Sequence, residues 1–561
     1  MARYLIVGGV AGGATAAARL RRLDEKAEII VFERGEYVSF ANCGLPYYIG
    51  RIIPDRRRLF VQTPQGFRNR FNIDVRVNAE VIGINRTDRT VNVKNLTNGE
   101  TYREKYDRII LAPGAEPLRP PIPGINSDGI FTLRNISDTD RIYAALNDKK
   151  PKSALIVGGG SIGLEMAENI SNLGIQVTIV EMADQVLAFL DYEMAAEVHQ
   201  HIRAKGVELL LKEGVTSFDI KNNMITTRLS SGRDITSGIV ILSIGVRPDA
   251  SLAKDAGLKI GPRGGIVVNE HLQTSDPDIY AVGDAIEFAN PITRKEVITY
   301  LAGPANRQGR LAADNIVSGN TKKYSGSIAT AVVKVFDLTV ASTGVSEKSL
   351  KADKIPHSTS ITHSESHATY YPGASEMSIK IIFSPDRGTL LGAQVIGRDG
   401  VDKRIDVLSA IIGMKGTIYN LLDFEQSYAP PFSSAKDPIT IAASVAENIL
   451  SGLVKVIKWN EIQKLDSAKI VLLDVRTQKE HRAGSIEGSI NIPIDELRNN
   501  LAALPKDKII VTYCAVGQRA YIANRILKQH GFDTVFNLSG GYKTYSMVHQ
   551  FADDADEGRY L

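Results

Sequence analysis

Cysteine is scarce in this chain of 561 residues, which contains only Cys43 and Cys514. Because these two lie far apart in sequence, the chain lacks a disulfide framework, and we expect free thiols in a reducing, cytoplasmic compartment. Long apolar runs are also missing. None approaches the ~20 residues that span a bilayer, which argues against a membrane protein. The net charge of +4 is small for this length and gives no reason to expect nucleic acid as a partner.

Each cysteine nevertheless stands in a setting that indicates chemistry. Cys43 lies in Ser39–Tyr48 (SFANCGLPYY), shortly after a glycine-rich loop, and Cys514 opens the loop CAVGQR near the C-terminus. An isolated cysteine is usually buried and structural, so each site needs its own support. The length suggests three or four domains, and we expect no metal site. The N-terminal apolar stretch reads as a strand that leads into the glycine loop, so we expect no cleaved leader.

The N-terminal region reads as a strand, a glycine-rich loop, a helix and a second strand. These are expected at Tyr4–Val7, Gly8–Gly13, Ala14–Leu23 and Glu28–Phe32. The same order recurs about 150 residues later, at Ser153–Val157, Gly158–Gly163, Leu164–Leu173 and Gln176–Val180. Such a loop brings backbone N–H groups and a helix N-terminus to a pyrophosphate, so the duplication predicts two dinucleotide sites.

The two loops differ in detail. The first, GGVAGG, has Val10 at the middle glycine position of the G-x-G-x-x-G pattern, whereas the second, GGGSIG, has all three glycines. An acid, Glu33 or Glu181, ends each second strand, where it can accept hydrogen bonds from a ribose. The carboxylate of Glu181 would repel the 2′-phosphate of NADPH, so NADH is expected. A single glycine pattern can also be a plain tight turn, but two in βαβ context are much stronger.

The remaining chain shows other patterns. Residues 82–110 alternate polar and apolar residues, which predicts a β-meander. Between about 324 and 450 the pattern predicts long strands and then helices, at Ala329–Val335, Met377–Phe383, Ile405–Met414 and Ile439–Leu450. Ser451–Lys458 reads as a linker, and a compact α/β unit of about 105 residues follows it.

Three further segments complete a family resemblance. Thr274–Ala285 reads as a strand that ends at Asp284. One flavoprotein class has two segments at which the chain passes back between its domains, and Tyr106–Ala115 and Ile239–Asp249 resemble these segments. With the two glycine loops, they make the first 320 residues resemble the pyridine nucleotide–disulfide oxidoreductase superfamily, which carries electrons from NAD(P)H through FAD to a thiol or disulfide. The resemblance implies an α/β fold with two Rossmann-like dinucleotide-binding domains and an α+β dimerisation domain.

The resemblance also implies domain limits and cofactor contacts. It places an FAD-binding domain at 1–112 and 266–322, an NAD-binding domain at 113–265 and a dimerisation domain at 323–450. Asp284 would hold the ribityl chain of FAD, and Glu165 would help to orient the nicotinamide of NADH. The implied cofactor contacts are Gly8, Val10, Ala11, Gly12, Glu33, Arg34, Val81, Pro113, Gly114, Asp284, Ala302, Gly158, Gly160, Ile162, Glu165, Glu181 and Gly245.

Cys43 stands alone where glutathione reductase-like members carry a redox-active pair. A single thiol beside a flavin must cycle as a mixed disulfide, a persulfide or a sulfenic acid. The segment Ser39–Tyr48 resembles that of coenzyme A-disulfide reductases, whose single-cysteine branch also holds NADH peroxidases and NADH oxidases. Tyr370, in YYPG, and Tyr428, in YAPPF, resemble the tyrosines that this family supplies across the dimer to the active-site thiol. Ordinary interface aromatics are the alternative for both.

A basic helix face suggests a site for coenzyme A. Thr15, Arg19 and Arg22 share one face of the first helix, at spacings of four and three residues. They resemble the family's site for the phosphates of coenzyme A, although a solvated basic face is the commoner fate of such a run. The resemblance adds Ser39, Asn42 and Arg70 as coenzyme A contacts. Phe71 follows Arg70 where the family often has another cation, which puts the 3′-phosphate contact in doubt.

Residues 456–561 resemble a single rhodanese domain, a further α/β unit. The matching pieces are Leu473–His481, Ala483–Pro493 and the strand Ile509–Tyr513 leading into Cys514–Ala520. In such a loop, backbone N–H groups and a helix dipole point at the sulfur of Cys514 and stabilise a persulfide anion. Four residues separate Cys514 from Arg519, a shorter loop than cysteine phosphatases use, and it suits sulfur rather than phosphate. An inactive docking module is the alternative, but such modules commonly lack the cysteine.

The whole chain resembles the coenzyme A-disulfide reductase–rhodanese fusions, also described as NADH-dependent persulfide reductases. This implies a homodimeric FAD enzyme that uses NADH to reduce persulfides, polysulfide, coenzyme A persulfide and possibly coenzyme A disulfide at Cys43, with sulfur transfer at Cys514. Coenzyme A would be a substrate or a bound group. Two alternatives remain: an NADH oxidase or peroxidase in which Cys43 cycles through sulfenic acid, and a redox-sensing flavoprotein scaffold.

Overall fold

The computed structural model describes residues 1–557 and divides into two compact units. Unit 1 is formed by Met1–Asp184 and Val207–Ala329, and unit 2 by Gln185–Gly206 and Thr330–Leu561. Both units are α/β, and the predicted fold class is confirmed. Within the described residues, no helix is both long and apolar enough to cross a membrane.

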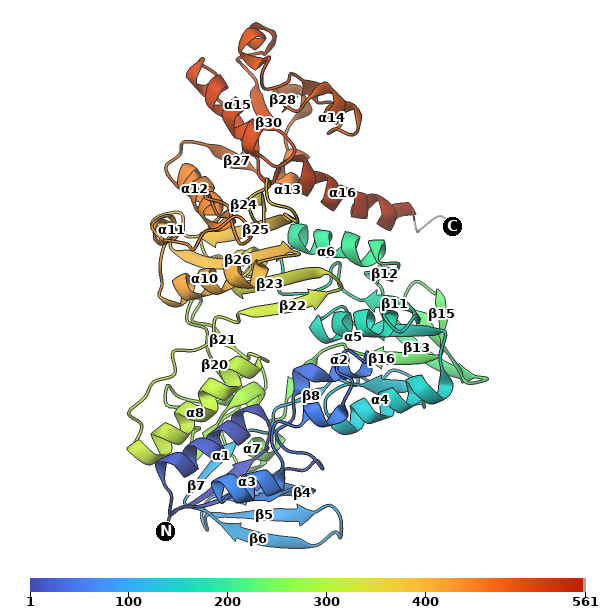
Figure 1. Cartoon of the computed structure of the whole chain (residues 1–561), viewed down its shortest axis with the longest axis vertical. Helices are drawn as coiled ribbons and strands as arrows, with labels where there is room; N and C mark the ends of the chain where they lie inside the picture. The colour runs from blue at the N-terminus through green and yellow to red at the C-terminus, as the bar shows by residue number, and fades with distance from the viewer. Residues whose placement is uncertain (558–561) are drawn as a thin grey trace. The chain divides into compact units, whose positions relative to one another are not determined.

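The first sheet of unit 1 is parallel and carries the first glycine loop (Figure 1). Its strand order is β19 (Ile279–Ala281), β7 (Arg108–Leu111), β1 (Arg3–Val7), β2 (Glu28–Phe32) and β3 (Asp74–Arg76). On the central strand β1, Leu5 pairs with Ile30 on one side and with Ile109 on the other, and all three side chains are buried. Strands buried on both faces read as continuous apolar runs, which explains why β2 lies where the sequence predicts it.

The second sheet of unit 1 repeats this plan. Its order is β12 (Glu208–Leu211), β11 (Gln176–Glu181), β10 (Ser153–Val157), β16 (Ile239–Leu242) and β9 (Ile130–Thr132). Helices α4 (Ile136–Lys149) and α5 (Ser161–Ser171) belong to it, as α1 (Ala11–Leu23) and α8 (Ala302–Ser318) belong to the first.

The helices after the two glycine loops begin earlier than predicted. Helix α1 begins at Ala11 rather than Ala14, and α5 at Ser161 rather than Leu164. The last glycine of each pattern therefore lies inside the first turn, where helix and strand approach too closely for a side chain. The expectation that glycine marks a loop was wrong at these positions.

Antiparallel ribbons and short helices complete unit 1. The predicted meander is present as β4 (Ala79–Asn85), β5 (Thr90–Asn95) and β6 (Thr101–Lys105), whereas β7 leaves it to join the parallel sheet. The other ribbon strands are β8 (Ala115–Pro117), β13 (Val215–Lys221), β14 (Met224–Leu229), β15 (Asp234–Ser237), β17 (Val246–Pro248), β18 (Ile266–Val267), β20 (Ile286–Ala289) and β21 (Glu296–Val297). The short helices are α2 (Leu45–Ile49), α3 (Pro64–Phe71) and α7 (Ser251–Asp255).

Unit 2 contains an antiparallel sheet that was predicted as part of the dimerisation domain. Its order is β22 (Ala331–Val335), β23 (Leu338–Gly344), β26 (Leu390–Gly397), β25 (Glu376–Phe383) and β24 (Ser358–Glu365). Helix α10 (Val401–Gly413) packs along β23 and β26, and α12 (Pro438–Leu450) along β24 and β25. The remaining helices are α9 (Glu347–Ala352), α11 (Ile418–Leu422) and α6 (Tyr192–Ala204).

A buried lysine fastens α6 to this sheet. Lys380 of β25 is fully buried, and its Nζ lies 2.9 Å from Asp191, 2.5 Å from Glu193 and 2.7 Å from Glu347. Three carboxylates around one ammonium offset its desolvation, and they raise the pKa of Lys380 against the effect of burial. Removing Lys380 would leave uncompensated buried carboxylates in this part of unit 2.

The C-terminal part of unit 2 is a parallel sheet with its own helices. Its order is β27 (Lys455–Ile457), β31 (Val535–Leu538), β30 (Ile509–Tyr513), β28 (Ile470–Asp474) and β29 (Ile490–Asn491). Its helices are α13 (Trp459–Ile462), α14 (Gln478–Arg482), α15 (Gln518–Gln529) and α16 (Gly541–Glu557), and α16 lies beside α6 (Figure 1). The predicted linker Ser451–Lys458 is only partly a linker, because Lys455–Ile457 pairs with β31 as an edge strand.

Candidate active sites

The first glycine loop has the geometry of a dinucleotide cradle. Gly8 has a φ of +95°, and a Cβ there would lie 2.1 Å from the carbonyl oxygen of Ala112. A Cβ on Gly13 would lie 1.9 Å from the oxygen of Gly8. Glu33 accepts hydrogen bonds from the N–H groups of Gly9 and Gly35, both at 2.9 Å, so its carboxylate is fixed beside the loop.

The second glycine loop repeats this geometry. A Cβ on Gly158 would meet the oxygen of Ser243 at 2.3 Å, and one on Gly163 would meet the oxygen of Gly158 at 2.1 Å. Glu181 accepts from the N–H groups of Gly159 at 2.6 Å and Ala183 at 2.8 Å. A Cβ on Gly160 would have no atom within 4 Å, so the middle of this loop is open to a pyrophosphate.

Asp284 fits a polar group of a bound flavin. It follows Gly283, whose N–H donates to Gln308 at 2.7 Å, and burial raises the pKa of Asp284 to about 6 although the Arg134 charge lowers it. A half-desolvated carboxylate of this kind gains from a hydroxyl donor, which a ribityl chain offers. With the cradle around Gly8 and Glu33, the residues present fit FAD.

Other predicted cofactor contacts lie in the elements expected. Val10 precedes α1 and Ala11 and Gly12 lie in its first turn, Ala302 begins α8, and Ile162 and Glu165 lie on α5. Gly114 and Gly245 have φ values of +78° and +112°. Arg34 forms ion pairs with Glu116 and, at 3.2 Å, with Asp249. Their contacts with FAD and NADH stay predictions, as do those of the remaining residues, Val81 and Pro113.

Cys43 lies on a single 3-10 turn, Asn42–Gly44, directly before α2. The residue is exposed, yet its surroundings desolvate the thiol, which raises its pKa, and the carboxylates of Glu165 and Asp284 raise it further. These groups disfavour the thiolate that sulfur chemistry requires.

Tyr47 links the Cys43 segment to α5, and the sequence analysis missed it. Its hydroxyl donates to Glu165 Oε1 at 3.4 Å, and burial raises the pKa of Glu165 to about 7 although the Tyr47 hydrogen bond opposes this. Burial and then Glu165 raise the pKa of Tyr47 in turn. The spacing of four residues from Cys43 was the available signal, because residues so spaced on a helical segment are neighbours.

The candidate coenzyme A contacts are only partly free. Arg19 Nε lies 2.6 Å from Asp314, and Thr15 donates to Asn306 at 2.6 Å, so both side chains engage α8. Arg22 and Arg70 are exposed. Ser39 and Asn42 both precede Cys43 in the chain, and Ser39 has a φ of +48°. The coenzyme A contacts therefore stay a prediction.

Tyr370 and Tyr428 meet on the surface of unit 2. Their hydroxyl oxygens are 2.8 Å apart although 58 residues separate them, and this hydrogen bond raises the pKa of Tyr370. Tyr370 is 74% exposed and Tyr428 49% exposed, and Phe432 nearby in sequence is 70% exposed. The two predicted tyrosines thus form one pair of phenols open to a partner.

Cys514 is buried at the end of β30, where an anion-stabilising loop was predicted. The N–H of Gly517 donates to its sulfur at 3.1 Å, and α15 begins at the next residue. Arg519 forms a bidentate ion pair with Glu480, at 2.9 and 2.6 Å, which lowers the pKa of Glu480 to about 2. The guanidinium is therefore held in place by α14, and its charge toward the sulfur is partly balanced.

Comparisons with known proteins match three segments of this chain. The chain matches the profile of the pyridine nucleotide-disulphide oxidoreductases over residues 2–309, their dimerisation domain over 330–438 and the rhodanese-like domain over 461–547. It is 35% identical to a coenzyme A disulfide reductase of Staphylococcus haemolyticus over 452 residues, 80% of this chain and 100% of that protein.

Two solved structures cover nearly the whole chain. The reduced CoADR-RHD of Bacillus anthracis is 51% identical with a TM-score of 0.96, covering 98% of both chains. An NAD-dependent persulfide reductase from A. fulgidus is 38% identical with a TM-score of 0.91, covering 97% of this chain and 100% of that one.

Proposed function

Because the chain belongs to the pyridine nucleotide-disulphide oxidoreductase family, we propose that it uses NADH and FAD to reduce persulfides and polysulfides at Cys43. Coenzyme A persulfide and coenzyme A disulfide belong to the proposed substrates, and Cys514 is proposed to transfer sulfane sulfur. The observation that carries this proposal is the presence of two free thiols in one chain: Cys43, which feels the charges of Glu165 and Asp284, and Cys514, which lies in a rhodanese-type loop.

The cofactors are assigned from the two cradles. The loop at Gly8–Gly13, Glu33 and Asp284 would hold FAD, and the loop at Gly158–Gly163 with Glu181 would hold NADH. When bound, these cofactors supply the two electrons of the reduction. Glu181 favours NADH, because its fixed carboxylate would repel a 2′-phosphate.

The residues of this chain would act on sulfur in two steps. The Cys43 thiolate attacks the outer, sulfane sulfur of R–S–SH, so that a Cys43 persulfide forms and R–S⁻ leaves. Two electrons then break the new S–S bond and give the Cys43 thiolate and HS⁻. The phenols of Tyr370 and Tyr428, supplied by the partner subunit of a homodimer, would donate to the thiolate that Glu165 and Asp284 disfavour.

At the second thiol, Cys514 would accept a sulfane sulfur from a donor and hold it as a persulfide. The Gly517 N–H and the start of α15 favour the anionic form. The proposed direction of transfer is from Cys514 to Cys43. We place the enzyme in a reducing cytoplasm, because both thiols must stay free to react.

A panel of acceptors tests this function. The purified protein is assayed with NADH and coenzyme A persulfide, coenzyme A disulfide, polysulfide, hydrogen peroxide or oxygen. We expect one hydrosulfide per NADH with a persulfide and slow turnover with peroxide and oxygen. Faster turnover with peroxide or oxygen would favour an NADH oxidase or peroxidase, and slow turnover with every acceptor would favour a redox sensor. Coenzyme A released by denaturing the protein would show whether it is a bound group.

A further inference from the structure

The first turn of α16 holds the Cys514 loop by its backbone. The N–H of Tyr542 donates to the carbonyl oxygen of Cys514 at 2.8 Å, and the N–H of Lys543 donates to that of Ala515 at 3.0 Å. Gly541 has a φ of +63°, and a Cβ there would lie 2.6 Å from the oxygen of Cys514. The path of the Cys514 loop is therefore set by where α16 begins.

The side chain of Thr544 connects the same turn to the antiparallel sheet of unit 2. Its Oγ1 lies 2.9 Å from Nε2 of His363 on β24, and Nδ1 of His363 lies 2.8 Å from Oγ of Ser378 on β25. Ser378 donates to Glu197 on α6 at 2.6 Å. Thr544, His363 and Ser378 are buried, so each of these bonds is costly to leave unmade.

The directions of these hydrogen bonds follow from their ends. Because Ser378 gives its proton to Glu197, its oxygen accepts from Nδ1–H of His363, and Nε2 then accepts from the hydroxyl of Thr544. Burial, followed by the Lys543 charge, lowers the pKa of His363 to about 3. The imidazole therefore stays neutral at physiological pH and keeps this arrangement.

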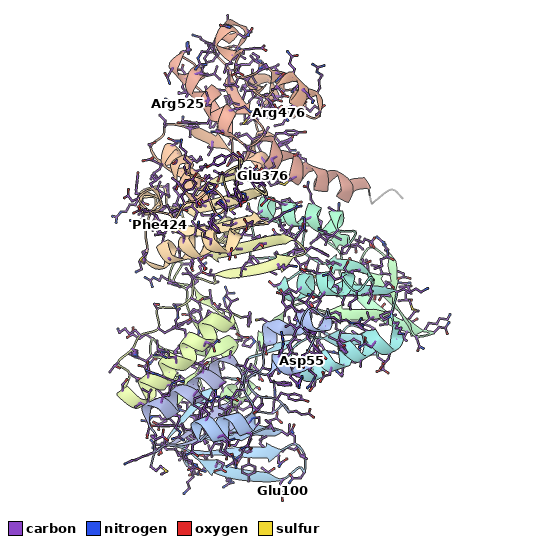
Figure 2. All side chains as sticks on the ribbon, viewed as in Figure 1. Asp55, Glu100, Glu376, Phe424, Arg476 and Arg525 are labelled. Atoms are coloured by element: carbon purple, nitrogen blue, oxygen red, sulfur yellow. The ribbon has the colours of Figure 1, made fainter. Side chains whose placement is uncertain are left out.

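The surrounding contacts are close enough to fix the position of the turn. Ser539 accepts from the N–H of Ile361 at 3.3 Å, and a Cβ on Gly540 would lie 2.1 Å from Oγ1 of Thr544 and 3.2 Å from a methyl carbon of Ile361. Lys543 Nζ lies 2.8 Å from Glu376, which Figure 2 labels at the start of β25. The rhodanese-type unit thus meets the sheet through directed bonds at the residues that hold its catalytic loop.

We infer that His363 and Thr544 are positioning residues for Cys514: a buried hydrogen bond to the dimerisation sheet fixes the turn that sets the sulfur-bearing loop. This inference rests on the proposed sulfur transfer at Cys514. It means that part of what shapes the rhodanese site lies outside the rhodanese sequence, on β24. A shift of that sheet would therefore also shift the position of the Cys514 loop.

A matched pair of variants in the full-length protein tests the inference. Thr544→Val removes the hydroxyl with little change of shape, and Thr544→Ser keeps it. We expect Thr544→Val to lower kcat for sulfur transfer from thiosulfate to cyanide by about tenfold with little change in KM, and Thr544→Ser to stay within about twofold of the parent. His363→Gln, which can donate and accept, should retain more activity than His363→Leu. Glu376→Gln weakens only the partly exposed ion pair with Lys543, which contributes little because solvent screens it, and this variant should stay within about twofold of the parent.

A second readout does not depend on turnover. In a Cys43→Ser background, peptide mass spectrometry follows the rate at which iodoacetamide labels Cys514. This rate should differ from that of the parent in Thr544→Val and His363→Leu, and it should equal that of the parent in Thr544→Ser. Melting temperatures are measured alongside, because a merely structural contact would lower them and leave labelling of the folded protein unchanged. Parent-like transfer and labelling in Thr544→Val and His363→Leu would overturn the inference, as would equal losses in Thr544→Ser. If the parent transfers no sulfur, the proposed function fails, and the labelling rates still decide the positioning role.

Discussion

Replacing Glu165 with Gln should stabilise unit 1 at alkaline pH and change it little at acid pH. Burial raises the pKa of this carboxyl from 4.5 to about 7; the Tyr47 hydrogen bond lowers it and the Glu168 charge raises it. The folded protein therefore pays to ionise Glu165, whereas Gln carries no charge at any pH. Gln also keeps an oxygen that can accept from Tyr47, so the substitution changes charge more than shape.

The sign and size of the effect follow from proton linkage. Between pH 4.5 and about 7 the folded protein retains a proton on Glu165 that the unfolded chain has released, so stability falls as pH rises through this window. The stabilisation that the protonated Glu165 gives to the folded state is present in full below pH 4.5 and is lost above pH 7. A gap from 4.5 to about 7 corresponds to at most about 3 kcal/mol. Glu165→Gln should gain up to that amount at pH 8 relative to its effect below pH 4.5.

Flavin release on heating provides the assay, because its fluorescence reports unit 1, where the proposed FAD site lies. The midpoint is compared at pH 5 and pH 8 for the parent, Glu165→Gln and the exposed-site control Glu100→Gln. We expect a rise at pH 8 that shrinks at pH 5, confined to Glu165→Gln. Labelling of Cys43 by iodoacetamide should also accelerate at pH 8, since the Glu165 charge raises the pKa of that thiol. Equal midpoint shifts at both pH values would refute the reasoning.

Four further outcomes are expected. Cys43→Ser should bind FAD yet lose NADH-dependent acceptor reduction by more than about a hundredfold, and parent-like turnover would exclude Cys43 as the nucleophile. Glu181→Gln should narrow a preference for NADH over NADPH, measured as the ratio of kcat/KM values, and no preference in the parent would contradict the charge argument. If Tyr428 acts across the dimer, a mixed dimer of Cys43→Ser and Tyr428→Phe chains contains one intact site and should show about half the activity of the parent. Activity no higher than that of the two single-variant homodimers would exclude this arrangement. Cys514→Ser should abolish thiosulfate–cyanide transfer and slow reduction of bulky sulfur donors, with small persulfides little affected; unchanged rates for both donor classes would show that the two thiols work independently.

Much of the fold could be predicted from the sequence because buried parallel strands are apolar along their whole length. The strands Glu28–Phe32, Ser153–Val157 and Ile509–Tyr513 lie where they were expected. Helix starts were wrong where glycine stands inside a first turn, as at α1 and α5. The short run Lys455–Ile457 was taken for linker, because its strand character depends on a partner, β31, about 80 residues away.

The residues of the candidate sites also fall into those that the sequence predicts and those that it does not. Motif residues such as Glu33, Glu181 and Cys514 lie beside the loops where local patterns place them, since each hydrogen-bonds to an N–H group of its own loop. The Tyr47–Glu165 pair and the His363–Thr544 bond join residues 118 and 181 positions apart. No periodicity or spacing encodes such pairs, because they arise only when separate elements pack together.

The environments of the two thiols also bear on the direction of sulfur flow. At Cys514 an N–H group and a helix start lie at the sulfur, and they would stabilise the persulfide anion proposed to form there. At Cys43, desolvation and the carboxylates of Glu165 and Asp284 disfavour the thiolate. The same groups would disfavour a persulfide anion there. In the proposed direction of transfer, a sulfane sulfur would therefore be held as a persulfide on Cys514 and reduced once it reached Cys43. Under the proposed function, this asymmetry would give the two thiols different roles, with Cys514 holding the sulfane sulfur and Cys43 presenting it for reduction.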